Sequence, residues 1–145
     1  MKDAHLKLEN QLCFRLYNVS KEVTRLYAPM LKAVGLTYPQ YLVMLVLWQH
    51  EKSCRVNEIG DLLNLDSGTL SPLLKRLESA GFVMRNRSEQ DERTVYIELT
   101  TQGQELKQQV NNIPLTLMRS SPLSGDEIAD LSRLLDKMKG GFNCQ

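Results

Sequence analysis

Residues 56–100 have the sequence VNEIGDLLNLDSGTLSPLLKRLESAGFVMRNRSEQDERTVYIELT, and this pattern predicts a helix, a tight turn, a second helix and a hairpin with a charged tip. The first helix is expected over 56–65, with Ile59, Leu62 and Leu63 facing the interior. This order of elements is typical of a helix-turn-helix that enters a DNA groove with a flexible basic wing beside it.

The second helix of this segment has a clear apolar face. Asp66 or Ser67 is expected to cap its amino end, and Ala80-Gly81 is expected to stop it. Pro72 removes one backbone hydrogen bond, so we expect the helix axis to bend there. The inner face carries four leucines at helical spacing: Leu70, Leu73, Leu74 and Leu77.

The polar residues around this apolar face, and those of the hairpin, are candidates for DNA contact. Small hydroxyl residues near a helix amino end approach base edges closely, and the backbone N–H groups there attract phosphate. An arginine at a hairpin tip can enter the narrow, negative minor groove. The alternative interpretation of the hairpin is a solvated, charge-balanced loop without a ligand. The predicted DNA-binding residues are Asp66, Ser67, Thr69, Lys75, Arg76, Arg85, Arg87 and Arg93, with Asp91 bracing Arg93.

The rest of the chain is predicted to be mostly helical, because its apolar residues recur at steps of three and four. The expected elements are helices over 6–34, 38–50, from 101 onward and over 124–139, strands over 82–86 and 94–99, and a polar loop over 51–55. The expected fold class is therefore mainly α (α+β), a winged helix-turn-helix in the order α-α-α-α-β-β-α-α.

The length of 145 residues predicts a single domain, residues 1–145. Its helices at 6–50 and 101–145 are expected to form a dimer interface, and 51–100 to form the DNA-binding unit. Such long helices exceed the mean of about 11–12 residues and need a partner along their length. A twofold homodimer is also what a palindromic site in double-stranded DNA requires.

The distribution of charge along the chain says more about DNA binding than the net charge does. The formal net charge is only +1, but residues 75–87 contain four basic residues and one acid. A local basic patch is what counts, because phosphate attraction is screened within about 8–10 Å in physiological salt.

Composition argues against several other classes of protein. No apolar run approaches the roughly 20 residues that span a bilayer, and the amino terminus lacks a secretory signal pattern. We therefore expect a cytoplasmic protein without a membrane partner, with its thiols reduced. The three cysteines and two histidines have no metal-ligand spacing, so no zinc site and no cofactor are expected.

Cys13 lies one position away from the apolar stripe of the first helix. A lone cysteine in an amphipathic helix usually serves as a small buried hydrophobe. With the helix expected to start at Leu6, neither a helix amino terminus nor a neighbouring histidine would lie beside this thiol. The residues alone therefore leave its role open.

Four motifs resemble the MarR family of winged-helix regulators, and more narrowly its OhrR branch of organic-hydroperoxide-sensing repressors. They are KLENQLCFRLY, LTYPQYLVMLVLW, LDSGTLSPLLKRLE and RSEQDERTVYIELT, and the resemblance runs from Lys7 to Pro114. It implies a dimeric repressor that releases its operator when an organic hydroperoxide oxidises Cys13. It also implies that Tyr27 and Tyr38 support the Cys13 thiolate, since a phenol that donates a hydrogen bond to sulfur favours the ionised form.

The spacing of these residues adds a geometric condition. Tyr27 is fourteen residues beyond Cys13, which is about 21 Å along a continuous helix at 1.5 Å per residue. One chain cannot bring the two side chains together, so the tyrosine must come from the second subunit.

The chain departs from the branch in its resolving thiol. Two-cysteine members place that thiol in the segment after the DNA-binding unit, where this chain has LTLMR at 115–119. Cys144 could reach across a dimer from the carboxyl-terminal tail, and Cys54 is expected to be incidental. A one-cysteine sensor that pairs with a small cellular thiol fits this pattern better.

Two other functions remain as alternatives. One is a MarR-type repressor released by a small phenolic ligand that binds between the domains, in which Cys13 has no sensing role. The other is a thiol peroxidase with Cys13 as its nucleophile. The absence of a CxxC motif, of a second cysteine at a credible distance and of any catalytic histidine counts against this enzyme, so no enzymatic activity is expected.

Overall fold

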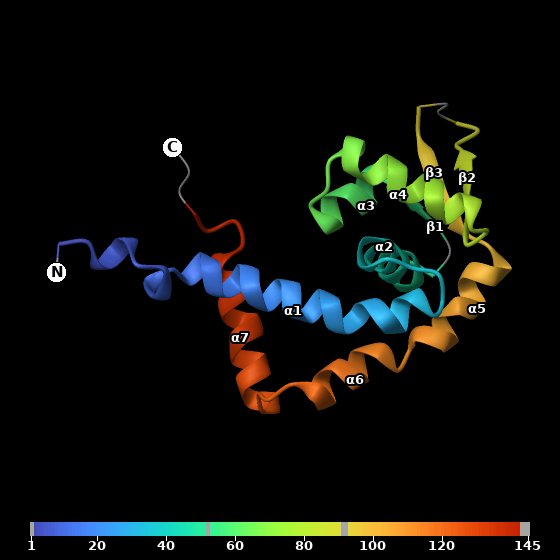
Figure 1. Cartoon of the computed structure of the whole chain (residues 1–145). Coiled ribbons are helices and arrows are strands. Elements are labelled where there is room, and N and C mark those ends of the chain that lie inside the picture. Colours follow the sequence, from blue (N-terminus) through green and yellow to red (C-terminus); the bar gives the residue numbers. More distant parts are fainter. Residues whose placement is uncertain (1, 52, 91–92, 143–145) are drawn as a thin grey trace. The chain divides into compact units, whose positions relative to one another are not determined.

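The computed structural model describes residues 2–51, 53–90 and 93–142 (Figure 1). The chain divides into two compact units, Met1–Ile113 and Pro114–Gln145. The first unit contains the 3-10 turns η1 (Ala4–Leu6) and η2 (Leu8–Asn10), and then α1 (Leu12–Lys32), α2 (Tyr38–Gln49), β1 (Ser53–Arg55), α3 (Val56–Leu63), α4 (Ser67–Ser79), β2 (Val83–Arg87), β3 (Val95–Leu99) and α5 (Thr101–Val110). Helix α6 (Ile113–Ser120) begins at the boundary, and α7 (Gly125–Met138) lies in the second unit.

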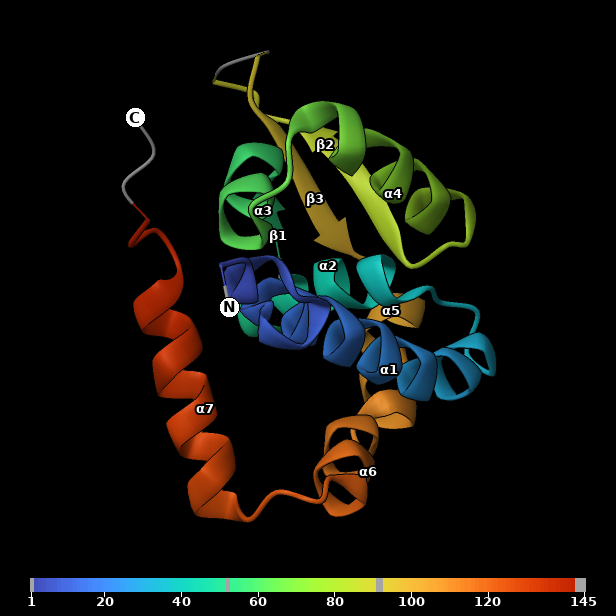
Figure 2. The same ribbon diagram turned by 60° about the vertical axis from the view of Figure 1, so that its left-hand side comes forward.

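Helix α2 is the central element of the first unit. Figures 1 and 2 both place it between α1 and the sheet, and it also contacts α3, α4 and α5. Its sequence is apolar on all sides, as expected of a helix that is surrounded by protein. Val43, Met44 and Leu47 are fully buried, and Trp48 donates an indole N–H to the Gly103 carbonyl at 3.0 Å.

The helix-turn-helix forms as the sequence predicts. Helix α3 ends at Asn64, which adopts the left-handed conformation (φ 54°), and Asp66 caps α4 by accepting the Thr69 N–H at 2.7 Å. Helix α4 runs through Pro72 as a single helix. All four leucines of its predicted inner face, Leu70, Leu73, Leu74 and Leu77, are buried. Leu62 of α3 was expected inside but is 54% exposed, so this expectation was wrong.

The sheet has three strands, in the order β1-β3-β2, and all pairs are antiparallel. The sequence predicted only two strands and a polar loop over 51–55. Residues 53–55 instead pair with β3, and Cys54 lies opposite Ile97 on the buried face. A strand of three residues is too short to show the alternating pattern by which strands are found in a sequence.

Two helix boundaries also differ from expectation. The first helix starts at Leu12 and not at Leu6, because the side-chain amides of Asn10 and Gln11 donate to the backbone carbonyls of Ala4 and His5 in η1. The helix expected from 101 onward ends at Val110, and α6 follows it. The order over the described residues is thus α-α-β-α-α-β-β-α-α-α.

The second unit consists of the end of α6 and helix α7. Ser124 and Glu127 form a capping box at the start of α7, close to the predicted start of this helix. Within the described residues α7 has no buried side chain, and Leu131, Leu134 and Leu135 are exposed. None of the helices in the described part of the chain has the length and apolarity needed to cross a membrane.

The junction of sheet and α5 depends on Thr100 and Gly103. The Thr100 hydroxyl accepts the Gly103 N–H at 3.0 Å and donates to the Gly81 carbonyl at 2.6 Å. A Cβ at Gly103 would collide with the Phe82 backbone carbonyl, which cannot swing away as a side chain can. The close approach of α5 to the sheet therefore requires glycine at this position.

We predict that Gly103→Ala lowers the free energy of unfolding by about 1–3 kcal/mol, the usual cost of forcing an extra methyl group into a packed interior. Gly125→Ala is the matched control, since a Cβ at this helical glycine meets no atom within 4 Å. It should leave stability unchanged or raise it slightly. Urea denaturation of both variants measures the difference, and equal effects would contradict the packing argument.

Candidate redox thiol and nucleic-acid interface

Helix α4 presents the predicted DNA-binding side chains on the face opposite its buried leucines. Ser67, Thr69, Lys75 and Arg76 are all exposed. Asp66 is exposed too, but its carboxylate is occupied as the cap of the helix. Hydrogen bonds from the Thr69 side chain and backbone hold the pKa of Asp66 below its usual value, so the cap stays charged at neutral pH.

The wing brings basic residues together beside α3. Arg85 and Arg93 line a recess of about 240 Å³ with Arg55, which the sequence did not suggest as a site residue. Arg85 also pairs with Glu78 of α4, at 3.8 Å between Nε and Oε2, and so links the wing to α4. Arg87 lies exposed at the end of β2. Asp91, the expected brace of Arg93, lies outside the described residues.

Cys13 is the second residue of α1, and its side chain is exposed. This placement corrects the expectation that no helix amino terminus lies beside it. The first-turn N–H groups of a helix have no partner within the helix and attract negative charge. The thiol is therefore accessible to a reactant and lies in the first turn of the helix.

Tyr27 and Tyr38 meet at the opposite end of α1. Their ring centroids are 5.2 Å apart, and Tyr41 completes the cluster at 5.8 Å from Tyr27 and 6.3 Å from Tyr38. Sequence reasoning missed Tyr41, although its spacing of three residues from Tyr38 in one helix indicated a shared face. We call Tyr27, Tyr38 and Tyr41 the tyrosine cluster.

Burial keeps the phenols of Tyr27 and Tyr41 neutral. Burial, and then the neighbouring Tyr38, raise the pKa of Tyr27 above its ordinary value. Burial also raises the pKa of Tyr41, with smaller effects from Tyr27 and Tyr38. A neutral phenol retains the O–H that it can donate to an anion.

Cys54 differs from Cys13 in its exposure to solvent, because Cys54 is buried and Cys13 is exposed. Cys54 is 2% exposed, and burial, followed by the neighbouring Glu58, raises its pKa to about 11. It is therefore protonated and shielded at neutral pH, in accord with the expectation that it takes no part in redox chemistry. Its surroundings are unexpected, because His50 and Glu58 lie beside it. Cys144 lies outside the described residues.

Both units expose apolar side chains. In the first unit Leu12, Tyr17 and Val19 of α1 are 53–60% exposed. In the second unit the exposed large apolar residues are Leu115, Met118, Leu123, Leu131, Leu134, Leu135 and Phe142. Monomeric proteins rarely leave contiguous apolar surface of this kind uncovered.

Comparison with known proteins identifies relatives along most of the chain. Residues 25–110 match the family described as transcriptional regulator SarA/Rot. The organic hydroperoxide resistance transcriptional regulator of Bacillus subtilis (strain 168) is 50% identical over 131 residues, which cover 90% of this chain and 88% of that protein.

Solved structures agree with this similarity. The structure of reduced AbfR bound to DNA has a TM-score of 0.82 at 38% identity and covers 97% of this chain and 96% of that chain; AbfR is from Staphylococcus epidermidis. Disulfide-formed AbfR gives a lower TM-score of 0.66 at the same identity, with coverage of 97% and 93%. A MarR variant from E. coli in complex with operator DNA has a TM-score of 0.75 at 29% identity, with coverage of 88% and 92%.

Proposed function

This chain belongs to the OhrR branch of the MarR family of winged-helix transcriptional regulators, and we propose that it is a homodimeric repressor that senses organic hydroperoxides through Cys13. Oxidation of this thiol releases the protein from its operator in the cytoplasm. One observation carries the proposal. Of the two cysteines in the described part of the chain, Cys13 is exposed at a helix amino end and Cys54 is buried as a neutral thiol.

The DNA-binding part of the proposal rests on α4 and the wing. The exposed face of α4 enters the major groove of double-stranded DNA, and its Arg76 is long enough to contact a base edge or a phosphate. Arg85, Arg87 and Arg93 supply charge beside it. Support comes from the DNA-bound structures of reduced AbfR and of MarR.

The dimer follows from two independent features. The exposed apolar side chains of α1 and of the second unit are not buried within one chain. A second copy of the chain would bury them in a dimer interface. The fourteen residues between Cys13 and Tyr27 lie in the unbroken helix α1, so about 21 Å separates their backbones. A phenol that supports the thiolate therefore comes from the partner, and a twofold dimer matches a palindromic operator.

The proposed chemistry has two steps. The Cys13 thiolate attacks the peroxide O–O bond, which breaks; with a proton from solvent, the products are a sulfenic acid and an alcohol. A thiol then attacks the sulfenic acid, forming a disulfide and releasing water. A small cellular thiol is proposed for this second step, because Cys54 is buried and protonated.

Oxidation of Cys13 weakens the hydrogen bonds that the tyrosine cluster donates to its sulfur. The phenols of the tyrosine cluster donate to a thiolate, and a disulfide sulfur is a far poorer acceptor. Loss of these hydrogen bonds shifts the helices at the dimer axis and changes the spacing of the two α4 helices. A shift of about one or two ångströms suffices, since packed interfaces switch between discrete arrangements.

We predict that cumene hydroperoxide releases the wild-type protein from operator DNA, whereas Cys13→Ser stays bound, because a serine hydroxyl cannot form a sulfenic acid. A gel-shift titration with a small thiol present measures this. Cys144→Ser is the matched control and should release like the wild type, because a small thiol is proposed to resolve the sulfenic acid. Equal release of wild type and Cys13→Ser would favour the ligand-released repressor instead. Peroxide turnover with excess reductant and no DNA affinity would favour a thiol peroxidase.

We also predict that Arg76→Ala and Arg93→Ala weaken operator binding in different ways. Loss of a base contact by Arg76 should cost about 1–3 kcal/mol and relax specificity at one base pair. Loss of Arg93 should weaken binding to all DNA sequences about equally. It should also lower the slope of log affinity against log salt concentration by about 1. Binding isotherms at several salt concentrations distinguish the two, with the exposed Lys107→Ala in α5 as the control. Undiminished affinity in both arginine variants would contradict the proposed interface.

A further inference from the structure

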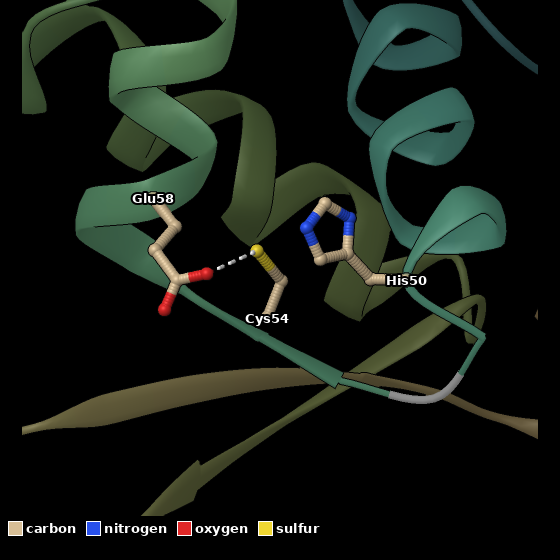
Figure 3. A group of neighbouring side chains, drawn as sticks. All are labelled: His50, Cys54 and Glu58. Carbon is tan, nitrogen blue, oxygen red and sulfur yellow. Dashed lines mark hydrogen bonds between the residues drawn. The ribbon is translucent and has the colours of Figure 1, made fainter.

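Three side chains of metal-binding type converge where α2, β1 and α3 meet (Figure 3). His50 follows the last residue of α2, Cys54 is the middle residue of β1, and Glu58 lies in the first turn of α3. One ligand atom from each lies within 4.8 Å of the other two, and Cys54 Sγ lies 3.7 Å from Glu58 Oε2.

Neighbouring groups already orient these side chains. His50 Nδ1 lies 2.9 Å from the Val46 carbonyl, which can only accept, so the ring donates its Nδ1–H there and leaves Nε2 for another partner. Figure 3 shows one ring nitrogen facing the Cys54 sulfur. Arg55 Nε binds the other Glu58 oxygen at 3.4 Å and leaves Oε2 to the sulfur. Metal-ligating histidines and carboxylates are usually held by such outer hydrogen bonds.

The backbone holds the sulfur while the other two groups can adjust. Cys54 pairs with Ile97 of the central strand and is 2% exposed, which fixes the position of the thiol. His50 and Glu58 are exposed, so each can rotate toward the sulfur. Tetrahedral zinc with bonds of about 2.0–2.3 Å holds its ligand atoms about 3.5 Å apart, close to the present distance between Sγ and Oε2.

We propose that His50, Cys54 and Glu58 form a site for Zn²⁺, with water as the fourth ligand. A thiolate, an imidazole and a carboxylate are a borderline-soft ligand set that excludes Mg²⁺ and Ca²⁺ as preferred ions. Zinc replaces the thiol proton, which passes to solvent. The exposed ligands leave the fourth position open to water and provide the entrance for the ion.

A zinc ion at this position would join α2, the central helix, to α3, the first helix of the DNA-binding unit. A zinc ion that binds the folded chain but not the unfolded chain raises the stability of the folded state by mass action. The proposal is independent of the role of Cys13, because Cys13 lies in α1 and is not one of the three ligands.

The test uses the full, untagged chain with Cys13→Ser and Cys144→Ser, which leaves Cys54 as its only thiol. Titration with Co²⁺, a spectroscopic substitute for zinc, should give one equivalent per chain and a thiolate-to-cobalt charge-transfer band. Zn²⁺ should abolish the band and raise the melting temperature. Cys54→Ser in this chain should lose the band.

Two surface variants keep the test decisive if the buried substitution disturbs folding. His50→Gln and Glu58→Gln should each weaken metal affinity by about tenfold or more, at least the effect of losing an outer-shell partner, while His5→Gln, at the other histidine, should not. Absence of the charge-transfer band, its persistence in Cys54→Ser, or unchanged affinity in both surface variants would each overturn the proposal.

Discussion

Helix α1 is long and rigid, and this constrains where the thiol and the phenols can lie. Cys13 is the second residue of the helix and Tyr27 lies four turns further on, in a helix that runs unbroken from Leu12 to Lys32. A helix cannot fold back on itself, because its backbone hydrogen bonds fix a rise of about 1.5 Å per residue. The thiol and the phenols are therefore kept apart within one chain, and a site that uses both must lie between two chains. Such a site senses the arrangement of the dimer as well as the oxidation state of sulfur.

The position of α2 explains how a change at that site could reach DNA. This helix contributes Tyr38 and Tyr41 to the tyrosine cluster and is in contact with α1, α3 and α4. Because its interior face is close-packed, it moves with its neighbours and does not deform locally. In the proposed dimer, a shift in α1 would be passed to α4 through this one buried element.

Much of the fold could be predicted from the sequence, because it depends on local patterns. The apolar run of α2, the leucine face of α4 and the Asp66 cap all have clear local signals. The start of α1 could not, since it depends on side-chain amides of Asn10 and Gln11 competing with the helix. Strand β1 was missed because its pairing with β3 is a tertiary contact.

The functional residues also divide into those with a local sequence signal and those that only tertiary contacts reveal. Cys13, Tyr27 and Tyr38 were found through their motifs, whereas Tyr41 and Arg55 became apparent only when the rings and the wing were placed. The cluster of His50, Cys54 and Glu58 spans a helix end, a strand and a helix start. The three residues are spaced four apart in the sequence, but they do not share one helix, so helical periodicity does not explain why they meet.

Mixed dimers test whether the Cys13 thiol of one subunit is supported by the Tyr27 phenol of the other. One mixed dimer pairs a Cys13→Ser chain with a Tyr27→Phe chain; the other pairs a chain carrying both substitutions with a wild-type chain. Each dimer keeps one Cys13, and the measured quantity is its rate of sulfenic acid formation with cumene hydroperoxide. The account predicts a wild-type rate in the first dimer, where Cys13 faces an intact Tyr27, and a slow rate in the second. The reverse order, or equal rates, would contradict it.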